Sequence, residues 1–370
     1  MKQLILLSHL FISVMALGQP LKSFKTAELW PDNNGNHINA HGGGILYQDK
    51  TYYWFGEFKS DGTSTALTGV SCYSSKDLYN WKYEGIALPV DTAAGSDITR
   101  GCVLERPKVV YNKKTKTFVM WFHLELKGKG YSAARCAVAT SKNVTGPYKF
   151  IRSFRPNSGI YPLNMKEEER NIKHSDTLKW WTPAWHTAVT QGYIALRDLA
   201  DGQMSRDMTI YVDDDGKAYH IYASEENLTL QIAELSDDYQ GHSGKYIRID
   251  PAGHNEAPAI FKKDGKYFMI TSGCTGWDPN EARLLTADNI MGTWTRHPNP
   301  CIGKDANKTF FSQSTYILQV QGKKDAFIFI ADRWKPKQHT DGRYIWLPIQ
   351  FKNGMPFIEW KDEWDLGVFK

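Results

Sequence analysis

What this chain lacks narrows the classes of protein to which it can belong. After the first 19 residues, no stretch stays apolar for the roughly 18 residues that a membrane-spanning helix needs. Its 45 Lys and Arg and 40 Asp and Glu residues give a net charge of only +5, without a basic block for nucleic acid. No Gly/Ser-rich or Pro-rich linker divides it. We therefore expect one domain with no membrane span and no nucleic-acid partner.

Cysteine is scarce as well. The chain has five cysteines, an odd number, and none of them has the C-x-x-C spacing of a zinc site. At least one thiol must therefore be free, and the sequence does not indicate any disulfide pairing. We expect no metal and no cofactor.

A nucleophile elbow of the form G-x-S-x-G is also missing. Residues 41–44 read HGGG, like the oxyanion-hole motif of esterases, but that motif requires the elbow. The nearest match, GHSGK at 241–245, lacks the final glycine. We interpret the glycines instead as positions where the backbone passes close to a ligand or to the axis of the fold.

The N-terminus reads MKQLILLSHLFISVMALGQ: one Lys, an apolar run and a small-residue cleavage site. This pattern is typical of a secretory signal peptide, which we assign to residues 1–18, leaving 19–370 as a single catalytic domain. The cleavage site has no cysteine, which argues against a lipoprotein anchor. We expect a monomer that is secreted or periplasmic.

Five segments repeat the order strand, polar turn, strand: residues 44–56, 109–122, 208–222, 259–273 and 315–330. Asp264-Gly265 is typical of the positive-φ turn of a β-hairpin. Apart from one longer gap, the spacing suits radial blades, whose known repeats run about 40 to 50 residues. The sequence therefore predicts an all-β fold, a five-bladed β-propeller.

The longer gap, about residues 151–203, interrupts the repeat between blades two and three. It has acidic and basic neighbours at helical spacing and the tryptophans Trp180, Trp181 and Trp185. We expect a partly helical insertion with one or two short helices lying over a propeller face. The tryptophans could wall a sugar subsite or pack the insertion against the blades.

Polar side chains stand just before the first strand of four hairpins. Glu256 precedes Ala-Pro, and Glu105 stands two residues before another proline, while Asp207 and Gln313 take the same place in blades three and five. Proline cannot donate to a sheet ladder, so Glu256 should lie at a strand start. Each residue alone could be structural, and Glu105 could simply pair with Arg106. The repetition favours a shared pocket.

A propeller brings the ends of its inner strands together around the axis. The four polar side chains should therefore converge, and crowded carboxylates raise the pKa of at least one of them. Paired acid and base carboxyls are what hydrolysis of a glycosidic bond requires. Together with an aromatic content of 13%, this predicts a glycosidase acting on an oligosaccharide or polysaccharide.

The same segments resemble a known family. The five hairpins, the Glu-Ala-Pro strand, DDDGKAY and SSKDLYNW look like glycoside hydrolase family 43, whose members are inverting enzymes on a five-bladed propeller. INAHGGGILY, ERPKVVYN, SRDMTIYVDDDGKAYHIYASEENLTL, SGCTGW and FFSQSTYIL look like its exo-β-1,3-galactanase branch. The resemblance implies release of galactose from the non-reducing end of β-1,3-galactan, the backbone of arabinogalactan.

The resemblance also implies roles for three residues. Glu256 would be the general acid, Glu105 would tune its pKa and orientation, and Gln313 would face the attacking water. The wider family has an Asp base in blade one where this chain has Gly42, and the galactanase branch shares that loss. An amide is barely basic, so either an imidic tautomer relays the proton or a carboxylate such as Asp207 or Glu57 helps.

Six further residues are candidates for contacts with the sugar, although each could equally be structural. Five are polar side chains and the sixth is a stacking platform: Glu57, Asp207, Asn227, Thr275, His41 and Trp277. Two alternatives stay open. The chain could have another family 43 activity, such as α-L-arabinofuranosidase or β-xylosidase, or it could be a carbohydrate-binding propeller without catalysis.

Overall fold

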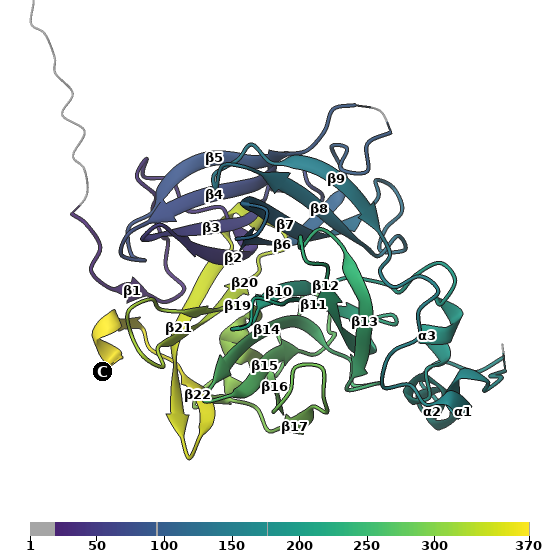
Figure 1. Ribbon diagram of the computed structural model, residues 1–370. Coiled ribbons are helices and arrows are strands. Elements are labelled where there is room, and N and C mark those ends of the chain that lie inside the picture. Colours follow the sequence, from purple (N-terminus) through teal and green to yellow (C-terminus); the bar gives the residue numbers. More distant parts are fainter. Residues whose placement is uncertain (1–18, 94, 176, 370) are drawn as a thin grey trace, which may run out of the picture.

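The computed structural model describes residues 19–93, 95–175 and 177–369, so the expected signal peptide lies outside the described residues. Five β-sheets surround a central axis, which confirms the predicted five-bladed propeller (Figure 1). Four sheets have four antiparallel strands each: β2 (His41–Gln48), β3 (Thr51–Phe58), β4 (Gly69–Ser75), β5 (Lys82–Pro89); β6 (Val103–Asn112), β7 (Thr117–Glu125), β8 (Arg135–Ser141), β9 (Lys149–Phe154); β10 (Met208–Val212), β11 (Ala218–Ser224), β12 (Thr229–Leu235), β13 (His242–Ile249); β14 (Glu256–Lys263), β15 (Lys266–Ser272), β16 (Arg283–Ala287) and β17 (Thr295–His297).

The fifth blade has five strands, in the order β18-β22-β21-β20-β19. Its outermost strand is parallel to its neighbour, and the other pairs are antiparallel. The bounds are β18 (Cys301–Ile302), β19 (Gln313–Gln319), β20 (Phe327–Arg333), β21 (Arg343–Lys352) and β22 (Met355–Glu359), with the 3-10 helices η1 (Ala306–Phe311), η2 (His339–Asp341) and η3 (Leu366–Val368) nearby in the chain.

The five predicted hairpins are the two innermost strands of each blade: β2-β3, β6-β7, β10-β11, β14-β15 and β19-β20. The turn between β14 and β15 places Asp264 at φ 50° and Gly265 at φ 81°, the left-handed conformations that the Asp-Gly pair accommodates. The local turn chemistry therefore fixes the register of this hairpin.

Four of the inner strands each have a β-bulge near the end that lies at the axis. The register of β2, β6, β14 and β19 shifts by one residue against the next strand, just after the first paired residues. Gly42, Arg106 and Ala257 take left-handed φ values of 60°, 57° and 54° in three of these bulges. A bulge re-aims the neighbouring side chains, and here it does so at the end of each strand near the axis.

The insertion differs in detail from the prediction. Strand β9 continues to Phe154, so the first residues assigned to the insertion complete blade two. Three short helices follow instead of one or two: α1 (Glu167–Arg170), α2 (Pro183–Thr190) and α3 (Tyr193–Arg197). Trp185 packs in a buried cluster with Val189, Ile194 and Leu228, while Trp180 and Trp181 are exposed. No helix in the described ranges is long and apolar enough to cross a bilayer.

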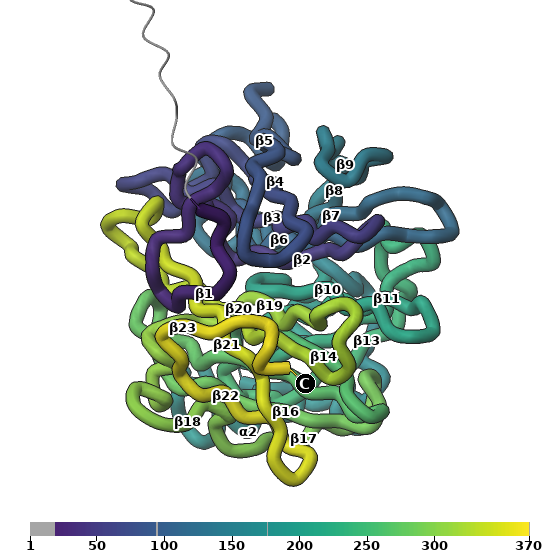
Figure 2. The backbone as a smooth tube through the Cα atoms, turned by 90° about the vertical axis from the view of Figure 1, so that its left-hand side faces the viewer, coloured from purple at the N-terminus to yellow at the C-terminus, as the bar shows by residue number. Residues whose placement is uncertain are grey.

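Aromatic residues fill the seam where the ring closes. Trp54 of blade one contacts Tyr344 and Trp346 of blade five, with ring centroids 4.7 and 5.1 Å apart. Next to this cluster, β1 (Phe24–Lys25) pairs with β23 (Glu363–Trp364), so the two ends of the described chain lie side by side (Figure 2). Much of the aromatic content therefore serves the core.

We expect Trp54→Ala to lower the free energy of unfolding by about 3–5 kcal/mol, because the side chain is 1% exposed and its loss leaves a cavity in the seam. Chemical denaturation measures the change. Leu29→Ala, at a side chain that is 60% exposed, is the control and should change stability little. A loss below about 1 kcal/mol for Trp54→Ala would show that the seam does not hold the ring together.

Candidate active site

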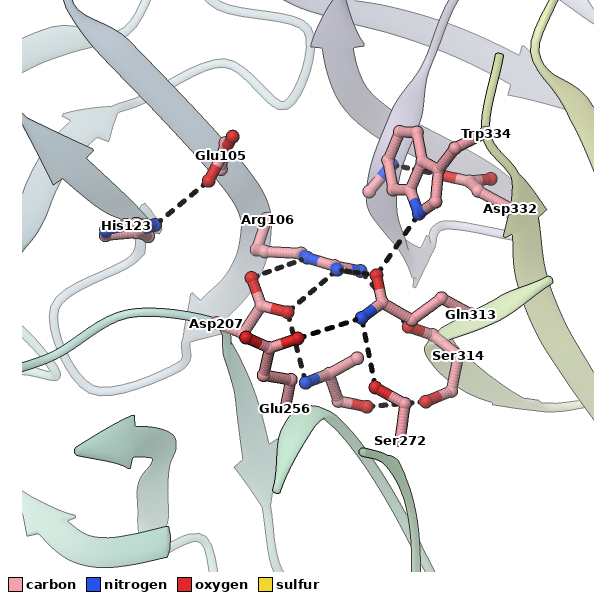
Figure 3. A network of polar contacts seen from close by, with 12 residues as sticks. Glu105, Arg106, His123, Asp207, Glu256, Ser272, Gln313, Ser314, Asp332 and Trp334 are labelled. Carbon is pink, nitrogen blue, oxygen red and sulfur yellow. Dashed lines mark hydrogen bonds and ion pairs between the residues drawn. The ribbon is translucent and has the colours of Figure 1, made fainter. Parts of the chain in front are cut away.

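A cavity of about 330 Å³ opens at the axis, where the inner strands begin. All four residues that were expected to converge line this cavity: Glu105, Asp207, Glu256 and Gln313. Figure 3 shows the polar network that joins Asp207, Glu256 and Gln313 through Arg106, with Glu105 and His123 as a separate pair. The other lining residues come from second strands and loops: Glu57, Lys59, Ser64, Arg106, His123, Tyr131, Arg206, Asn227, Gly276, Trp277 and Trp334.

Glu256 is the first residue of β14, at the strand start that the proline predicted. Burial and the nearby charge of Asp207 raise the pKa of Glu256 to about 7. The side-chain amide of Asn227 donates to its Oε1 at 2.7 Å. Oε2 accepts only a long contact of 3.5 Å from Nε2 of Gln313. Because Oε1 accepts the stronger hydrogen bond, the proton of the neutral carboxyl belongs on Oε2.

Arg106 crosses the axis and holds two other blades. Its Nε and Nη2 donate to the two carboxylate oxygens of Asp207 at 3.0 and 2.8 Å, a bidentate pair. Nη2 also donates to Oε1 of Gln313 at 2.5 Å, and Nη1 donates to the carbonyl of Ser314 at 3.1 Å. The Glu105–Arg106 pair considered from the sequence is therefore not the main contact of this guanidinium.

Gln313 is held by both ends of its amide. Oε1 accepts from Arg106 and from Nε1 of Trp334, the latter at 3.1 Å. Nε2 donates to Oγ of Ser272 at 3.0 Å and faces Glu256 at 3.5 Å. These contacts fix which end of the amide faces Glu256, and the long contact to Glu256 is the weakest of the four.

Glu105 lies on another wall of the cavity, in a row of charges. Its Oε2 is 3.2 Å from Nδ1 of His123, whose Nε2 is 2.9 Å from Glu125, and the hydroxyl of Tyr131 donates to its Oε1 at 2.9 Å. Burial opposes ionisation of Glu105, but the hydrogen bond and charge of His123 outweigh it and hold the pKa at about 2. His123 is an imidazolium, since both carboxylates raise its pKa to about 9 against the effect of burial.

The ligand atoms of Glu105, His123 and Asp207 lie within 4.8 Å of one another, close enough to share a metal ion. Both ring nitrogens of His123, however, already bond to carboxylates, and Asp207 is occupied by Arg106. Protonated histidine and arginine thus supply the positive charge that these carboxylates need.

Glu57 occupies the space that a side chain at residue 42, the position of the missing blade-one acid, would take. Glu57 pairs with Lys59 and accepts from the backbone nitrogen of Arg106 at 3.0 Å. A Cβ built on Gly42 would overlap Oε1 of Glu57, and φ at Gly42 is 60°. A side chain at residue 42 is therefore incompatible with Glu57 as placed, which explains the glycine physically.

The structure does not bring all the predicted sugar contacts to the cavity. Glu57, Asp207, Asn227 and Trp277 line it, and Trp277 is 45% exposed. His41 and Thr275 are not among the described residues that line the cavity. His41 is fully buried and stacks on Tyr344 with centroids 5.3 Å apart, while the Thr275 hydroxyl bonds within its own loop.

Several site residues were missed from the sequence: Lys59, Arg106, His123, Tyr131, Ser272 and Trp334. A signal for two of them was present. In the hairpins of blades two and four, the residue opposite the position before the bulge also belongs to the site, and these pairs are Glu105–His123 and Glu256–Ser272. Counting across the turns, as for Glu57 opposite His41, would have found them. Tyr131 comes from a loop that has no such register.

The arrangement separates two carboxyl groups by their charge state. Glu256 is neutral at moderately acidic pH and can give up a proton, whereas Glu105 stays ionised. Their environments set the difference, because Glu105 has a direct cationic partner, whereas Glu256 accepts from the neutral amides of Asn227 and Gln313. This pairing of a protonated and an ionised carboxyl suits acid-assisted cleavage of a bond to oxygen.

Comparison with protein families and curated proteins gives two matches. A model described as glycosyl hydrolases family 43 matches residues 175–356. A β-D-galactofuranosidase of Aspergillus niger is 30% identical over 108 residues, which cover 28% of this chain and 31% of that protein. The match thus spans about a third of the length of this curated relative.

Solved structures match over nearly the whole chain. A family 43 β-1,3-galactosidase solved with galactodeoxynojirimycin is 61% identical, with a TM-score of 0.91, over 93% of this chain and 100% of that one. An exo-β-1,3-galactanase of Phanerochaete chrysosporium solved with β-1,3-galactotriose is 32% identical, with a TM-score of 0.75, over 94% and 68%. An exo-β-1,3-galactanase of Clostridium thermocellum is 34% identical, with a TM-score of 0.75, over 92% and 66%.

The Glu256 carboxyl should titrate with a pKa near 7, and Asp207→Asn should lower that value by about one unit, because a neighbouring negative charge disappears. NMR of ¹³C-labelled glutamate, assigned by difference from Glu256→Gln, follows the titration. Asp97→Asn is the control and should leave the titration unchanged, because Asp97 pairs with Arg135 at 3.3 Å and does not line the cavity. An unchanged or raised pKa in Asp207→Asn would contradict the electrostatic account.

Proposed function

The chain belongs to family 43 of the glycosyl hydrolases, and from this premise we propose that it is a glycosidase that releases galactose from the non-reducing end of β-1,3-galactan. The observation that carries the proposal is the pairing of a protonated Glu256 with the amide of Gln313, together with Gly42 in blade one, where a side chain would overlap Glu57 as placed. The 61% identity to a β-1,3-galactosidase over 93% of the chain supports the same substrate.

Glu256 acts as the general acid. Its Oε2 carries the proton, because Asn227 occupies Oε1, and a pKa near 7 keeps the carboxyl protonated at the pH where many enzymes work. Protonation of the glycosidic oxygen makes the leaving sugar a neutral alcohol. Glu105 remains ionised and adds negative charge to the cavity as the oxocarbenium-like transition state forms.

Attack by water leads to inversion at the anomeric carbon. Retention through a covalent intermediate needs a free carboxylate as nucleophile near the acid. The group that faces Glu256 is the amide of Gln313, and Asp207 is held by both nitrogens of the Arg106 fork. Gln313, oriented by Arg106 and Trp334, positions the water by hydrogen bonding. The oxygen of the water forms the new bond to the anomeric carbon as the bond to the leaving oxygen breaks, and the proton that the water loses passes to the carboxylate of Asp207 in the same cavity and from there to solvent.

The cavity suits a terminal sugar. Its volume of about 330 Å³ lies at the small end of the range for small-molecule sites, about 300–1,000 Å³. Trp277 and Trp334 stand at its rim with centroids 6.0 Å apart, so an exposed aromatic face is available to a galactose ring. Removal of one residue at a time from a chain end fits this shape better than cleavage within a chain.

The biological setting follows from the substrate. The N-terminal sequence fits export, and a secreted or periplasmic monomer would meet arabinogalactan, whose backbone is β-1,3-galactan. All five cysteines are free thiols in the structure, so the described fold does not depend on disulfides. Fractionation of the producing cells and analytical ultracentrifugation test the location and the oligomeric state.

Purified protein should release single galactose units from β-1,3-galacto-oligosaccharides, and the first product should have the inverted anomeric configuration. Glu256→Gln should lower kcat/KM by about 10²–10⁴-fold, because the proton donor is lost. Gln313→Ala should also abolish most activity, since the water loses its positioning group. Chromatography identifies the product and ¹H NMR its anomer, with Asp97→Asn as the unaffected control.

Other results would change the assignment. Release of arabinose, xylose or galactofuranose without cleavage of galactan would keep the acid and replace the substrate. Retained configuration would require a carboxylate nucleophile and would rule out the role given to Gln313. No turnover of any glycan, with glycan binding intact, would make the protein a binding propeller.

The rate should depend on pH through Glu256. The acid must be protonated to act, so kcat/KM should fall as pH rises through about 7, and the limb should be absent for an aryl galactoside whose leaving group needs no proton. Asp207→Asn should move the alkaline limb to lower pH. An alkaline limb of equal position for both substrates would assign it to another group.

A further inference from the structure

The loop between β11 and β12 holds the hydrogen-bond partner of Glu256 in a strained conformation. Glu225, Glu226 and Asn227 have successive φ values of 52°, 58° and 63°, the left-handed region that residues with a side chain rarely adopt. Such a run persists only when its surroundings impose it. The contacts that hold this loop therefore decide whether Asn227 reaches Glu256.

The first anchor is a buried ion pair. Arg248 of β13 donates to Glu225 through Nε at 2.7 Å and through Nη2 at 2.8 Å, and the Glu225 side chain is fully buried. Thr229 and Gln231 donate to the same carboxylate at 3.1 and 3.3 Å. A bidentate pair with these added hydrogen bonds fixes the position of residue 225.

The same arginine reaches into the insertion. Its Nη2 donates to the carbonyl of Val189 at 2.6 Å and Nη1 to that of Thr190 at 3.1 Å. These carbonyls lie in the last turn of α2, where backbone donors run out, and the carbonyl of Val189 also accepts from the backbone nitrogen of Gly192 at 2.9 Å. Arg248 thus fastens the last turn of α2 to the loop that contains Asn227.

Three more contacts hold the loop: two ion pairs of Glu226 and the packing of Leu228. Glu226 accepts from Arg197 of α3 at 3.1 Å and from Arg206 at 3.0 Å. Leu228 is buried in the cluster that contains Trp185 and Ile194 of the insertion. Each of the residues on either side of Asn227 is therefore held by the helical insertion, whereas Asn227 itself points to Glu256.

We propose that Arg248 and the insertion helices are positioning elements for the general acid, holding Asn227 against Oε1 of Glu256 through Glu225. This inference rests on the proposed function, because it assigns the insertion a role in that reaction. The insertion helices do not line the cavity, so the residues that orient the acid extend beyond the propeller axis. Without Arg248, the strained loop relaxes and the acid loses its orientation.

The test separates acid catalysis from general damage with two substrates. β-1,3-galactobiose needs a proton on its leaving group, whereas 2,4-dinitrophenyl β-D-galactopyranoside does not. We expect Arg248→Met to lower the ratio of their kcat/KM values by about tenfold, in the direction of Glu256→Gln but to a smaller extent. A loss of active fraction or of general integrity would lower both values equally and leave the ratio unchanged.

A second readout needs no substrate. Removal of the Asn227 donor takes away a hydrogen bond that favours the ionised carboxyl, so the Glu256 titration followed by ¹³C NMR should move to higher pH in Arg248→Met. If the Glu256 titration does not move to higher pH in Arg248→Met while wild-type protein still cleaves β-1,3-galactobiose, only this inference is overturned. If wild-type protein cleaves no β-1,3-galactoside, the proposed function fails, and the direction of the titration alone decides whether Arg248 positions Glu256.

Arg248→Met leaves the buried Glu225 unpaired and could unfold the protein. The double variant Glu225→Gln/Arg248→Met removes both charges, keeps the net charge and still breaks the anchor, so it should show the same loss of ratio. The matched control is Arg152→Met, since Arg152 also bonds a backbone carbonyl, that of Gln240 at 2.8 Å, and stacks on Phe154 in blade two. It should leave the ratio unchanged.

A double-mutant cycle identifies the route. If Arg248 acts through Asn227, then Arg248→Met added to Asn227→Ala should not lower the substrate ratio further. Additive losses would show that Arg248 affects the acid by another path and would overturn the inference. An unchanged ratio and an unchanged titration in the charge-neutral double variant would overturn it as well.

Discussion

The hydrogen bonds of Arg106 are the interactions on which the described site depends. Arg106 belongs to blade two, and its guanidinium binds Asp207 of blade three and Gln313 of blade five. Its backbone nitrogen donates to Glu57 of blade one. Asp207 in turn accepts from the backbone of Ala257 in blade four at 3.1 Å. A buried charge is tolerated only with such complete pairing, so one arginine fixes how the five inner strands meet.

The parts of this arrangement that follow from local rules were predicted from the sequence. Alternating apolar strands and the Asp264-Gly265 turn gave five hairpins, and the proline after Glu256 placed that residue at a strand start. The convergence of Glu105, Asp207, Glu256 and Gln313 followed from propeller geometry alone. Each of these inferences needs only the residues within one hairpin and the symmetry of the ring.

What the sequence did not reveal depends on contacts between distant segments. A one-residue bulge decides which neighbouring side chain faces the cavity, so His41, which takes the place of Glu105 in register, points instead into the aromatic seam. The guanidinium of Arg106 points away from the adjacent Glu105 for the same reason. Tyr131 contacts Glu105 from a loop, whose course the hairpin pattern does not predict. The start of the insertion was placed too early, because the pairing of the outer strand β9 has no local signal in the sequence.

The charge states of the two carboxyls follow from how the cations are shared. Burial disfavours the charged form of both, but Glu105 faces His123, which is itself kept protonated by Glu125, while the cations near Glu256 are already committed. Arg106 is bound to Asp207, and the pKa of Glu256 is raised by burial first and by the negative charge of Asp207 second. A fold that brought a free arginine to Glu256 would ionise it and remove the acid. Because the Arg106 fork binds Asp207 and forms no direct pair with Glu256, burial and the charge of Asp207 outweigh the lowering effect of Arg106, and Glu256 keeps its proton.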